Sequence, residues 1–537
     1  MKKISVQTWI VLGTALLYFA FFSVLSICAH RGFQTQMNDL GNMDLAFRQA
    51  SKGNLTMPTS NLPSGQACSR LAIHTNFIFW LLAPLYWVWP NPEILLILTS
   101  FACALSGVGL YFFSKQHLGS SRWNLVPAFA FWLSPLVHDA NLYDFHILTV
   151  TTALIIWTAW AFDSGRLRTA WILLGLAVIC QEDIPMVTFF LGLYLVFTGK
   201  PRRGIPVMVL SVLYTGFLAE VILPFFRHGQ QLWSDISDRY SYLGYSPEAI
   251  LMAMIKHPEK FFSVIIQHDH LRFPIYLLIC GAAVGVTAWP MLLLILPQLS
   301  LALLSETSWS TRVTGTYYWV ICEAVIIMAC VLAAKRSMKK KQGNFRWQLA
   351  YLGTVTVVLS LIFSPTPYGM GASWDNYAPV TERKTLNEIL RIVPENAEIC
   401  VQNNIGPQLS QRPFVWSYPH RCEMKKAKYM LFYLRYTSGR NSGFFVRTLD
   451  LIIFQISLKE LLAGVEWLIR IPGWRLVVQK DGFYLFGRGA SSALEQEEAL
   501  RKFREDADIM EKAYKAANQY YIPWSGYLTG GYARVHF

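Results

Sequence analysis

The chain has 537 residues, of which 53% are hydrophobic and 15% are charged, and its formal net charge is +14. So apolar a composition excludes an ordinary soluble domain and is typical of an integral membrane protein. Lys and Arg stand mainly in short loops between apolar runs, which indicates membrane orientation and gives no support for a nucleic-acid partner.

Apolar runs suited to membrane-crossing helices recur from the N-terminus to residue 364. The first run follows Lys2 and Lys3, lacks a small-x-small cleavage site, and is therefore expected to stay as an uncleaved first helix. About eleven crossings are predicted in all. Their ranges are 9–28, 94–113, 124–138, 147–163, 169–180, 184–199, 204–226, 273–288, 290–304, 317–334 and 347–364.

Basic residues concentrate in alternate short loops, which is the pattern of the cytoplasmic side of a membrane. With the N-terminus inside, the inner loops hold these basic residues: Lys115, Arg122, Arg166, Arg168, Lys200, Arg202, Arg203, Lys335, Arg336, Lys339, Lys340, Lys341 and Arg346. The opposite loops hold the concentrated acids, so the sequence predicts an acidic outer face.

The stretch 74–90, HTNFIFWLLAPLYWVWP, is apolar but contains Pro84. Counting it as a crossing would invert every later loop, so it is predicted to be an interfacial or re-entrant helix. Its tryptophans Trp80, Trp87 and Trp89 suit the headgroup level. It belongs to a long first outer loop, residues 29–93.

Beyond the transmembrane part, residues 1–364, a Pro/Gly/Ser-rich linker leads into segments of mixed polarity. AEICV, KYMLFYL, WRLVVQ and FYLFGR are predicted strands, and Asp481-Gly482 between the last two indicates a hairpin. The predicted fold class is therefore a polytopic α-helical membrane protein with a C-terminal soluble α/β domain, residues 365–490, on the outer side. Residues 491–537 are predicted to form an amphipathic helix and a Tyr/Gly-rich tail.

Most of the nine cysteines lie in apolar runs, where a small apolar residue explains them. Two disulfides are open if the outer side is oxidising, Cys28 with Cys68 and Cys400 with Cys422. The chain has no CxxC pair, HExxH motif or phosphate-binding Gly loop, so zinc-finger, zincin and P-loop chemistry have no support.

Three acidic groups fall in the predicted outer loops. The first consists of Asp39 and Asp44, which lie about one helical turn apart. The other two, Asp144-Phe145-His146 and Glu182-Asp183, stand at the next two predicted outer turns. Each acid alone can be a helix cap or an ion-pair partner of Arg31, Arg48 or Arg312. Ionisable groups at a bilayer edge are costly, about 2–3 kcal/mol each, which favours a functional role for the set.

Carboxylates beside a histidine suit general-base activation of an acceptor hydroxyl. They also suit a divalent cation, Mg²⁺ or Mn²⁺, for which Asp39, Asp144 and His146 are the predicted ligands. His146 can equally be an ordinary hydrogen-bonding residue. Tyr317 and Tyr318 can stack on sugar or lipid, although an interfacial aromatic belt explains them as well.

Six stretches resemble, in order, the bacterial membrane proteins grouped as domain of unknown function 2079. They are NDLGNMDLAFRQA, HTNFIFWLLAPLYWVWPNPEILL, SPLVHDANLYDFHILT, QEDIP, RYSYLGYSPEAIL and IVPENAEICVQNNIGPQLSQRPFVWSYP. The resemblance as a whole extends over roughly residues 36–490. Elements of that family's pattern include the DLG with a second Asp, the His at 74, the DFH, the ED pair and LS-x-R. The chain departs from it at Leu45, where Gln is usual, and at Gln181, where Lys is usual.

That family is similar in layout to the polytopic glycosyltransferases of the C-type fold, GT-C. The resemblance implies a polyprenyl-phosphate-linked sugar donor, an unidentified acceptor (lipid, glycan or protein) on the outer face of the bacterial cytoplasmic membrane, and Asp39 as base with Asp44 close behind. The residues then expected to bind substrate are Asp144, His146, Glu182, Asp183, His74, Arg312, Tyr317 and Tyr318. An ion-coupled transporter or flippase, and a non-catalytic membrane scaffold, are the alternatives.

Overall fold

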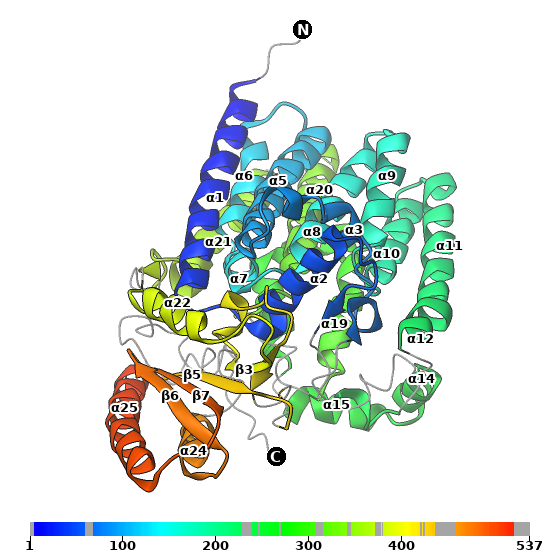
Figure 1. The fold of residues 1–537 in the computed structure, drawn as a ribbon. Helices are drawn as coiled ribbons and strands as arrows, with labels where there is room; N and C mark the ends of the chain where they lie inside the picture. Colours follow the sequence, from blue (N-terminus) through cyan, green and yellow to red (C-terminus); the bar gives the residue numbers. More distant parts are fainter. Residues whose placement is uncertain are drawn as a thin grey trace.

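The fold is a helical bundle with a small sheet at one end, as the computed structural model shows (Figure 1). The structure describes residues 5–59, 68–227, 239–244, 247–267, 270–306, 315–340, 345–370, 377–378, 380–418, 422, 425–434 and 458–519.

Helices occupy every predicted span. The bundle consists of α1 (Val6–Arg31), α5 (Glu93–Leu118), α6 (Leu125–Leu133), α7 (Pro135–Tyr143), α8 (Ile147–Asp163), α9 (Leu167–Val178), α10 (Ile184–Phe197), α11 (Pro201–Phe217), α12 (Leu223–Phe226), the run Arg272–Leu303, α20 (Val320–Lys340) and α21 (Arg346–Phe363). By length and composition, five helices among the described residues suffice to cross a membrane. The number of eleven crossings stays a prediction.

The run Arg272–Leu303 reverses direction. A straight helix of its 32 residues would be about 48 Å long. Yet a ring nitrogen of His270, just before the run, lies 3.0 Å from the carbonyl oxygen of Leu303 at its end. The reversal lies near Trp289, whose ring is 4.9 Å from that of Phe197 at the far end of α10. The two halves therefore correspond to the predicted spans 273–288 and 290–304.

Helix α20 is the core of the bundle, and every residue from Val320 to Val331 is buried. It packs against α5, α6, α8 and α21. The neighbouring helices surround this apolar helix. They also keep the carboxyl group of Glu323, which is buried, away from lipid.

The apolar stretch 74–90 does not span. It forms two short helices, α3 (Ile78–Leu82) and α4 (Leu85–Val88), joined at Pro84. Together they extend about 16 Å, far below the 30 Å of a bilayer core. The indoles of Trp80 and Trp87 donate to carbonyl oxygens of the preceding loop. These helices fit the predicted interfacial or re-entrant element.

The four predicted strands are present. With β4, which was not predicted, they form one mixed five-stranded sheet in the order β4-β3-β5-β7-β6. Its strands are β3 (Ile399–Gln402), β4 (Val415–Tyr418), β5 (Tyr429–Tyr433), β6 (Trp474–Lys480) and β7 (Phe483–Arg488). The hairpin predicted at Asp481-Gly482 is confirmed, because β6 and β7 pair antiparallel across it. Helices α22 (Glu382–Ile392), α24 (Leu458–Arg470) and α25 (Ala493–Gln519) accompany the sheet (Figure 1).

The sheet is packed onto the predicted first outer loop, residues 29–93. Phe33 and Met37 share one buried cluster with Ile399, Leu431 and Phe483 of the sheet. Figure 1 shows this unit at the end of the bundle opposite the start of α1. Of the two disulfides considered from the sequence, Cys400–Cys422 is formed, whereas Cys28 is a free thiol.

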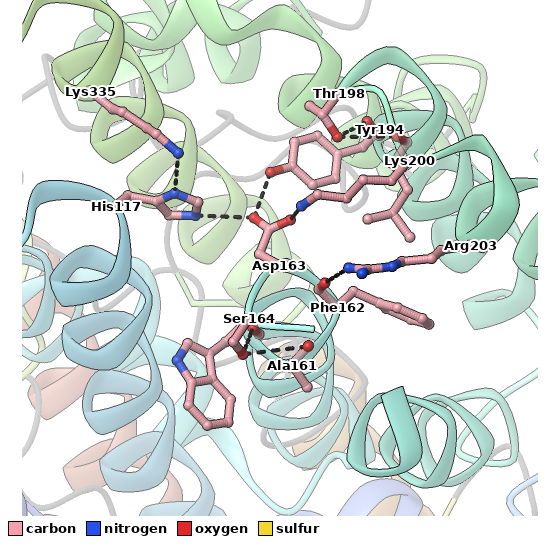
Figure 2. Close-up of polar contacts among 12 residues, drawn as sticks. His117, Ala161, Phe162, Asp163, Ser164, Tyr194, Thr198, Lys200, Arg203 and Lys335 are labelled. Carbon is pink, nitrogen blue, oxygen red and sulfur yellow. Dashed lines mark hydrogen bonds and ion pairs between the residues drawn. The ribbon is translucent and has the colours of Figure 1, made fainter. Parts of the chain in front are cut away.

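The other end of the bundle holds a buried polar cluster (Figure 2). Asp163, at the end of α8, accepts from His117 Nε2 at 3.0 Å, from Tyr194 OH at 2.8 Å and from Lys200 Nζ. Lys335 Nζ lies 2.9 Å from His117 Nδ1. Helices α5, α8, α10 and α20 therefore end together, so loops predicted to be cytoplasmic from their basic residues do share one face.

Candidate active site at the outer end of the bundle

Asp39 lies on a π-helical turn, Met37–Gly41, that enters the helix α2 (Asn42–Ser51). Gln36 before it is extended, with φ −120° and ψ 139°. The first N–H groups of a helix lack partners within the helix, so other parts of the chain must accept from them. Here the Gln36 N–H donates to Asp144 Oδ2 at 3.0 Å, which joins two of the three predicted acidic groups.

The side chain of Asp39 is 23% exposed, whereas that of His146 beside it is only 7% exposed. Asp39 Oδ1 lies 3.6 Å from His146 Nε2. Tyr317 stacks on the imidazole, with ring centroids 3.3 Å apart, and Tyr318 stands 4.4 Å from Tyr317. The predicted residues Asp39, His146, Tyr317 and Tyr318 are thus brought together; with Asp144 we call them the outer site.

Burial sets the charges of this site. It lowers the pKa of His146 well below its usual range, and the nearby charges of Arg70 and His74 lower that pKa further. Burial also raises the pKa of Asp144 well above its usual range, with the charge of Asp39 as the second cause. His146 is therefore neutral near pH 7, and Asp39 is the site's accessible carboxylate.

Asp44 lies apart from the outer site. It is fully buried and accepts hydrogen bonds from Tyr86 OH at 2.7 Å and from Ser410 Oγ at 2.8 Å. The two hydrogen bonds lower the pKa of Asp44, but burial raises it by more, so that this pKa is about 6. A carboxylate enclosed by two hydroxyl donors suits a structural role. The expectation that Asp44 acts as a second base therefore receives no support from its surroundings.

The third acidic group forms a separate cluster with His74. Glu182 Oε1 lies 2.6 Å from His74 Nδ1, and its Oε2 accepts the Thr75 N–H at 3.0 Å. Burial alone would raise the pKa of Glu182, but the charge and hydrogen bond of His74 lower it overall. This pair ties the stretch 74–90 to the turn before α10, and His74 in turn acts on His146 electrostatically.

Asp183, next in the chain, accepts from Gln298 Nε2 at 3.2 Å. Burial, followed by the neighbouring charge of Glu182, raises the pKa of Asp183 to about 7. Adjacent carboxyls with pKa values pushed apart are common at functional sites, although structural networks also produce them.

The raised pKa of Asp183 predicts a pH-dependent stability. The folded state holds its proton up to about pH 7, whereas in the unfolded chain Asp183 ionises near pH 4. Its contribution to stability is therefore full below about pH 4 and is lost as the pH rises to about 7. The Asp183→Asn variant should flatten that part of the melting-temperature profile in detergent. An unchanged slope between pH 4 and 7 would contradict the assignment.

The predicted metal site and the predicted role of Arg312 are not supported by any contact among the described residues. Among the described residues, no three His, Cys, Asp or Glu side chains are arranged to hold a metal ion. Asp39, Asp144 and His146 as ligands of a divalent cation therefore stay a prediction, and the reaction proposed for this protein uses no cation. Arg312 lies outside the described residues.

Tyr143 and Arg70 also lie near His146, and sequence reasoning gave no site role to Tyr143. The ring of Tyr143 is 5.4 Å from His146 and 5.3 Å from Tyr317. Arg70 is buried, donates from Nε to Asn76 Oδ1 at 2.9 Å, and acts electrostatically on His146. Tyr143 stands directly before the DFH motif, but nothing in the sequence shows its side chain lying against the ring of His146.

A family model for "Predicted membrane protein (DUF2079)" matches residues 29–435, which is most of the chain. The chain belongs to the DUF2079 family. The family resemblance drawn from the six stretches is thereby confirmed, including the stretches that supply Asp39, His146 and Glu182.

Solved structures give a weaker likeness. ArnT from Cupriavidus metallidurans bound to undecaprenyl phosphate matches with a TM-score of 0.48 and 10% identity, covering 91% of this chain and 99% of that one. The oligosaccharyltransferase AglB from Archaeoglobus fulgidus, in complex with an inhibitory peptide and a dolichol-phosphate, matches with a TM-score of 0.37 and 10% identity, covering 89% and 74%. TM-scores below 0.5 support no further conclusion. No curated protein matches.

Proposed function

We propose that this DUF2079 protein is a membrane glycosyltransferase that moves a sugar from a polyprenyl-phosphate donor to an acceptor on the outer face of the cytoplasmic membrane. The observation that carries the proposal is the pairing of one accessible carboxylate, Asp39, with a buried neutral His146 among aromatic rings, at the predicted outer end of an apolar bundle. The layout resemblance noted in the sequence agrees with it.

The reaction is a single displacement at the anomeric carbon. Asp39 takes the proton of the acceptor hydroxyl while the oxygen of that hydroxyl bonds to the anomeric carbon. The bond from this carbon to the oxygen of the donor phosphate breaks at the same time. The electron pair leaves with the polyprenyl phosphate, so the anomeric configuration inverts. A positioned carboxylate suits this general-base role, which contributes about 10²–10⁴-fold to a rate.

The neighbours of Asp39 assist by shape and charge. Tyr317 stacks on His146 and holds its imidazole beside the carboxylate. Arg70 supplies buried positive charge near His146, as an anionic donor phosphate requires. The apolar helices α3 and α4, with Leu81 and Val88 exposed, offer a surface for the lipid tail.

Lipid analysis of the purified protein tests the donor class. The full chain, extracted in mild detergent, is analysed by native mass spectrometry and by lipid mass spectrometry after denaturation. We expect a polyprenyl phosphate or its glycosyl ester to copurify in a stoichiometric amount. An Arg70→Gln variant should retain less of it. If ordinary phospholipids alone copurify with both proteins, the proposed donor is wrong.

An ion-coupled transporter is the second candidate, and one observation favours it. Asp139 on α7 and Glu323 on α20 are buried inside the bundle, each with a carboxyl oxygen that has no hydrogen-bond partner among the described residues. Intramembrane carboxyls of this kind are used by ion-coupled carriers. Uptake of a solute into proteoliposomes that requires a sodium or proton gradient would decide for this candidate.

A further inference from the structure

The segment QNNIGPQLSQRP, residues 402–413, follows β3 and approaches the first outer loop at several points. Gln408 Nε2 donates to the carbonyl oxygen of His30 at 2.8 Å. Ser410 Oγ donates to Asp44, and Gln411 Nε2 donates to the carbonyl oxygen of Pro90. A stretch of the C-terminal sheet unit therefore contacts both ends of the loop that carries Asp39.

The contact nearest to Asp39 is made by Asn403, which is fully buried. Its carbonyl oxygen accepts the Met37 N–H at 2.8 Å, and its side-chain Oδ1 accepts the Asn38 N–H at 3.2 Å. These are the first two N–H groups of the π-helical turn, which the turn itself leaves unbonded. Asn403 thus acts as the N-terminal cap of the turn that presents Asp39, although 365 positions separate it from Asn38.

The side chain of Asn403 is itself held in place. Its Nδ2 lies 3.4 Å from Gln36 Oε1, and its Oδ1 also accepts from Ser417 Oγ of β4 at 3.3 Å. Gly406 presses on the same turn, because a Cβ added there would lie 2.3 Å from the Cβ of Met37. Only glycine allows the backbone so close.

Asp144 holds the residue just before the same turn, because its Oδ2 accepts the Gln36 N–H at 3.0 Å. Three successive N–H groups before Asp39, those of Gln36, Met37 and Asn38, are therefore fixed by two distant parts of the chain. The position of the Asp39 carboxylate follows from these bonds, since few rotatable bonds remain between the fixed backbone and the carboxyl group.

We propose that Asn403 is a positioning residue of the outer site, and that the segment 403–410 completes this site by fixing the turn that carries Asp39. The inference rests on the proposed function only where it concerns activity. Its structural part, the capping of the turn by a residue of the C-terminal sheet unit, is testable without any substrate.

Hydrogen–deuterium exchange of the full chain in nanodiscs, resolved to single amides by electron-transfer fragmentation, tests the cap. Asn403→Ala should speed the exchange of the Asn38 amide at least about tenfold, because its acceptor is gone. Asn403→Asp retains Oδ1 and should restore slow exchange. The matched control is Asn404→Ala, which removes a neighbouring buried side chain whose Oδ1 has no partner among the described residues.

If exchange at Asn38 is the same in Asn403→Ala and Asn404→Ala, the cap is refuted, whatever the activity. With transfer established for the wild type, Asn403→Ala should lower kcat about 10- to 100-fold with little change in the KM for donor, while Asn403→Asp recovers most of it. Faster exchange at Asn38 with unchanged kcat would overturn the positioning role. Loss of activity in Asn403→Ala beside an active Asp39→Asn would instead refute the proposed function.

Discussion

The Asp39→Asn variant is expected to transfer sugar about 10²–10⁴-fold more slowly than the wild type, at an unchanged level of folded protein in the membrane. The amide is isosteric, so the π-helical turn and the neighbouring rings stay in place. It cannot take the acceptor proton, however, because a neutral amide oxygen is a very weak base. Single-turnover transfer from a polyprenyl-phosphate sugar measures the effect.

Asp44→Asn is the matched control for that experiment. Asp44 is buried between Tyr86 and Ser410, where an amide oxygen can still accept a hydrogen bond. Its variant should keep most of the activity and change mainly stability, since burial already raises the pKa of this carboxyl to about 6. Equal loss in both variants would mean that the two acids act as a unit. Full activity in Asp39→Asn would exclude Asp39 as the base.

The Asp163→Asn variant is expected to lose about 3–5 kcal/mol of unfolding free energy relative to the wild type, which is the largest loss among the substitutions proposed for this protein. Asp163 is almost fully buried and is bonded to Lys200, His117 and Tyr194 at once (Figure 2). Removing its charge leaves the ammonium of Lys200 without its partner at the end of the bundle. Breaking one side of a buried pair costs far more than the pair contributes.

Thermal unfolding in detergent, followed by tryptophan fluorescence, measures this loss. Asp508→Asn is the control, because Asp508 pairs with Lys512 on an exposed face of α25 and should matter by about 1 kcal/mol or less. The double variant Asp163→Asn/Lys200→Met should recover part of the loss, since it removes the unpaired charge. Equal melting temperatures for Asp163→Asn and Asp508→Asn would contradict the buried network.

Periodicity and charge predicted the parts of the fold that depend on local chemistry. Apolar runs marked the bundle helices except α7, most of which lies beyond the predicted span 124–138, and the Asp481-Gly482 pair marked the β6–β7 hairpin. The two spans predicted at 273–288 and 290–304 meet near Trp289, where the run Arg272–Leu303 reverses. The family membership was also predictable, since its motifs are short and contiguous.

The sequence was less informative where distant residues meet. It ranked Asp44 just behind Asp39, yet the buried surroundings of Asp44 depend on Tyr86 and Ser410, which no spacing rule connects. It gave Asn403 no role, because a cap drawn from 365 positions away leaves no periodic signal. The sidedness of Lys200 and Lys335 was predicted, but their shared partners Asp163 and His117 were not.

Sugar transfer by the purified full chain in proteoliposomes tests the central claim most directly. A polyprenyl-phosphate donor with a radiolabelled sugar is supplied together with a membrane extract as the source of acceptor. The account predicts labelled product that requires the wild-type protein and is lost in Asp39→Asn but retained in Asp44→Asn. No labelled product with any polyprenyl-phosphate sugar, together with gradient-driven uptake of solute by the same proteoliposomes, would contradict it.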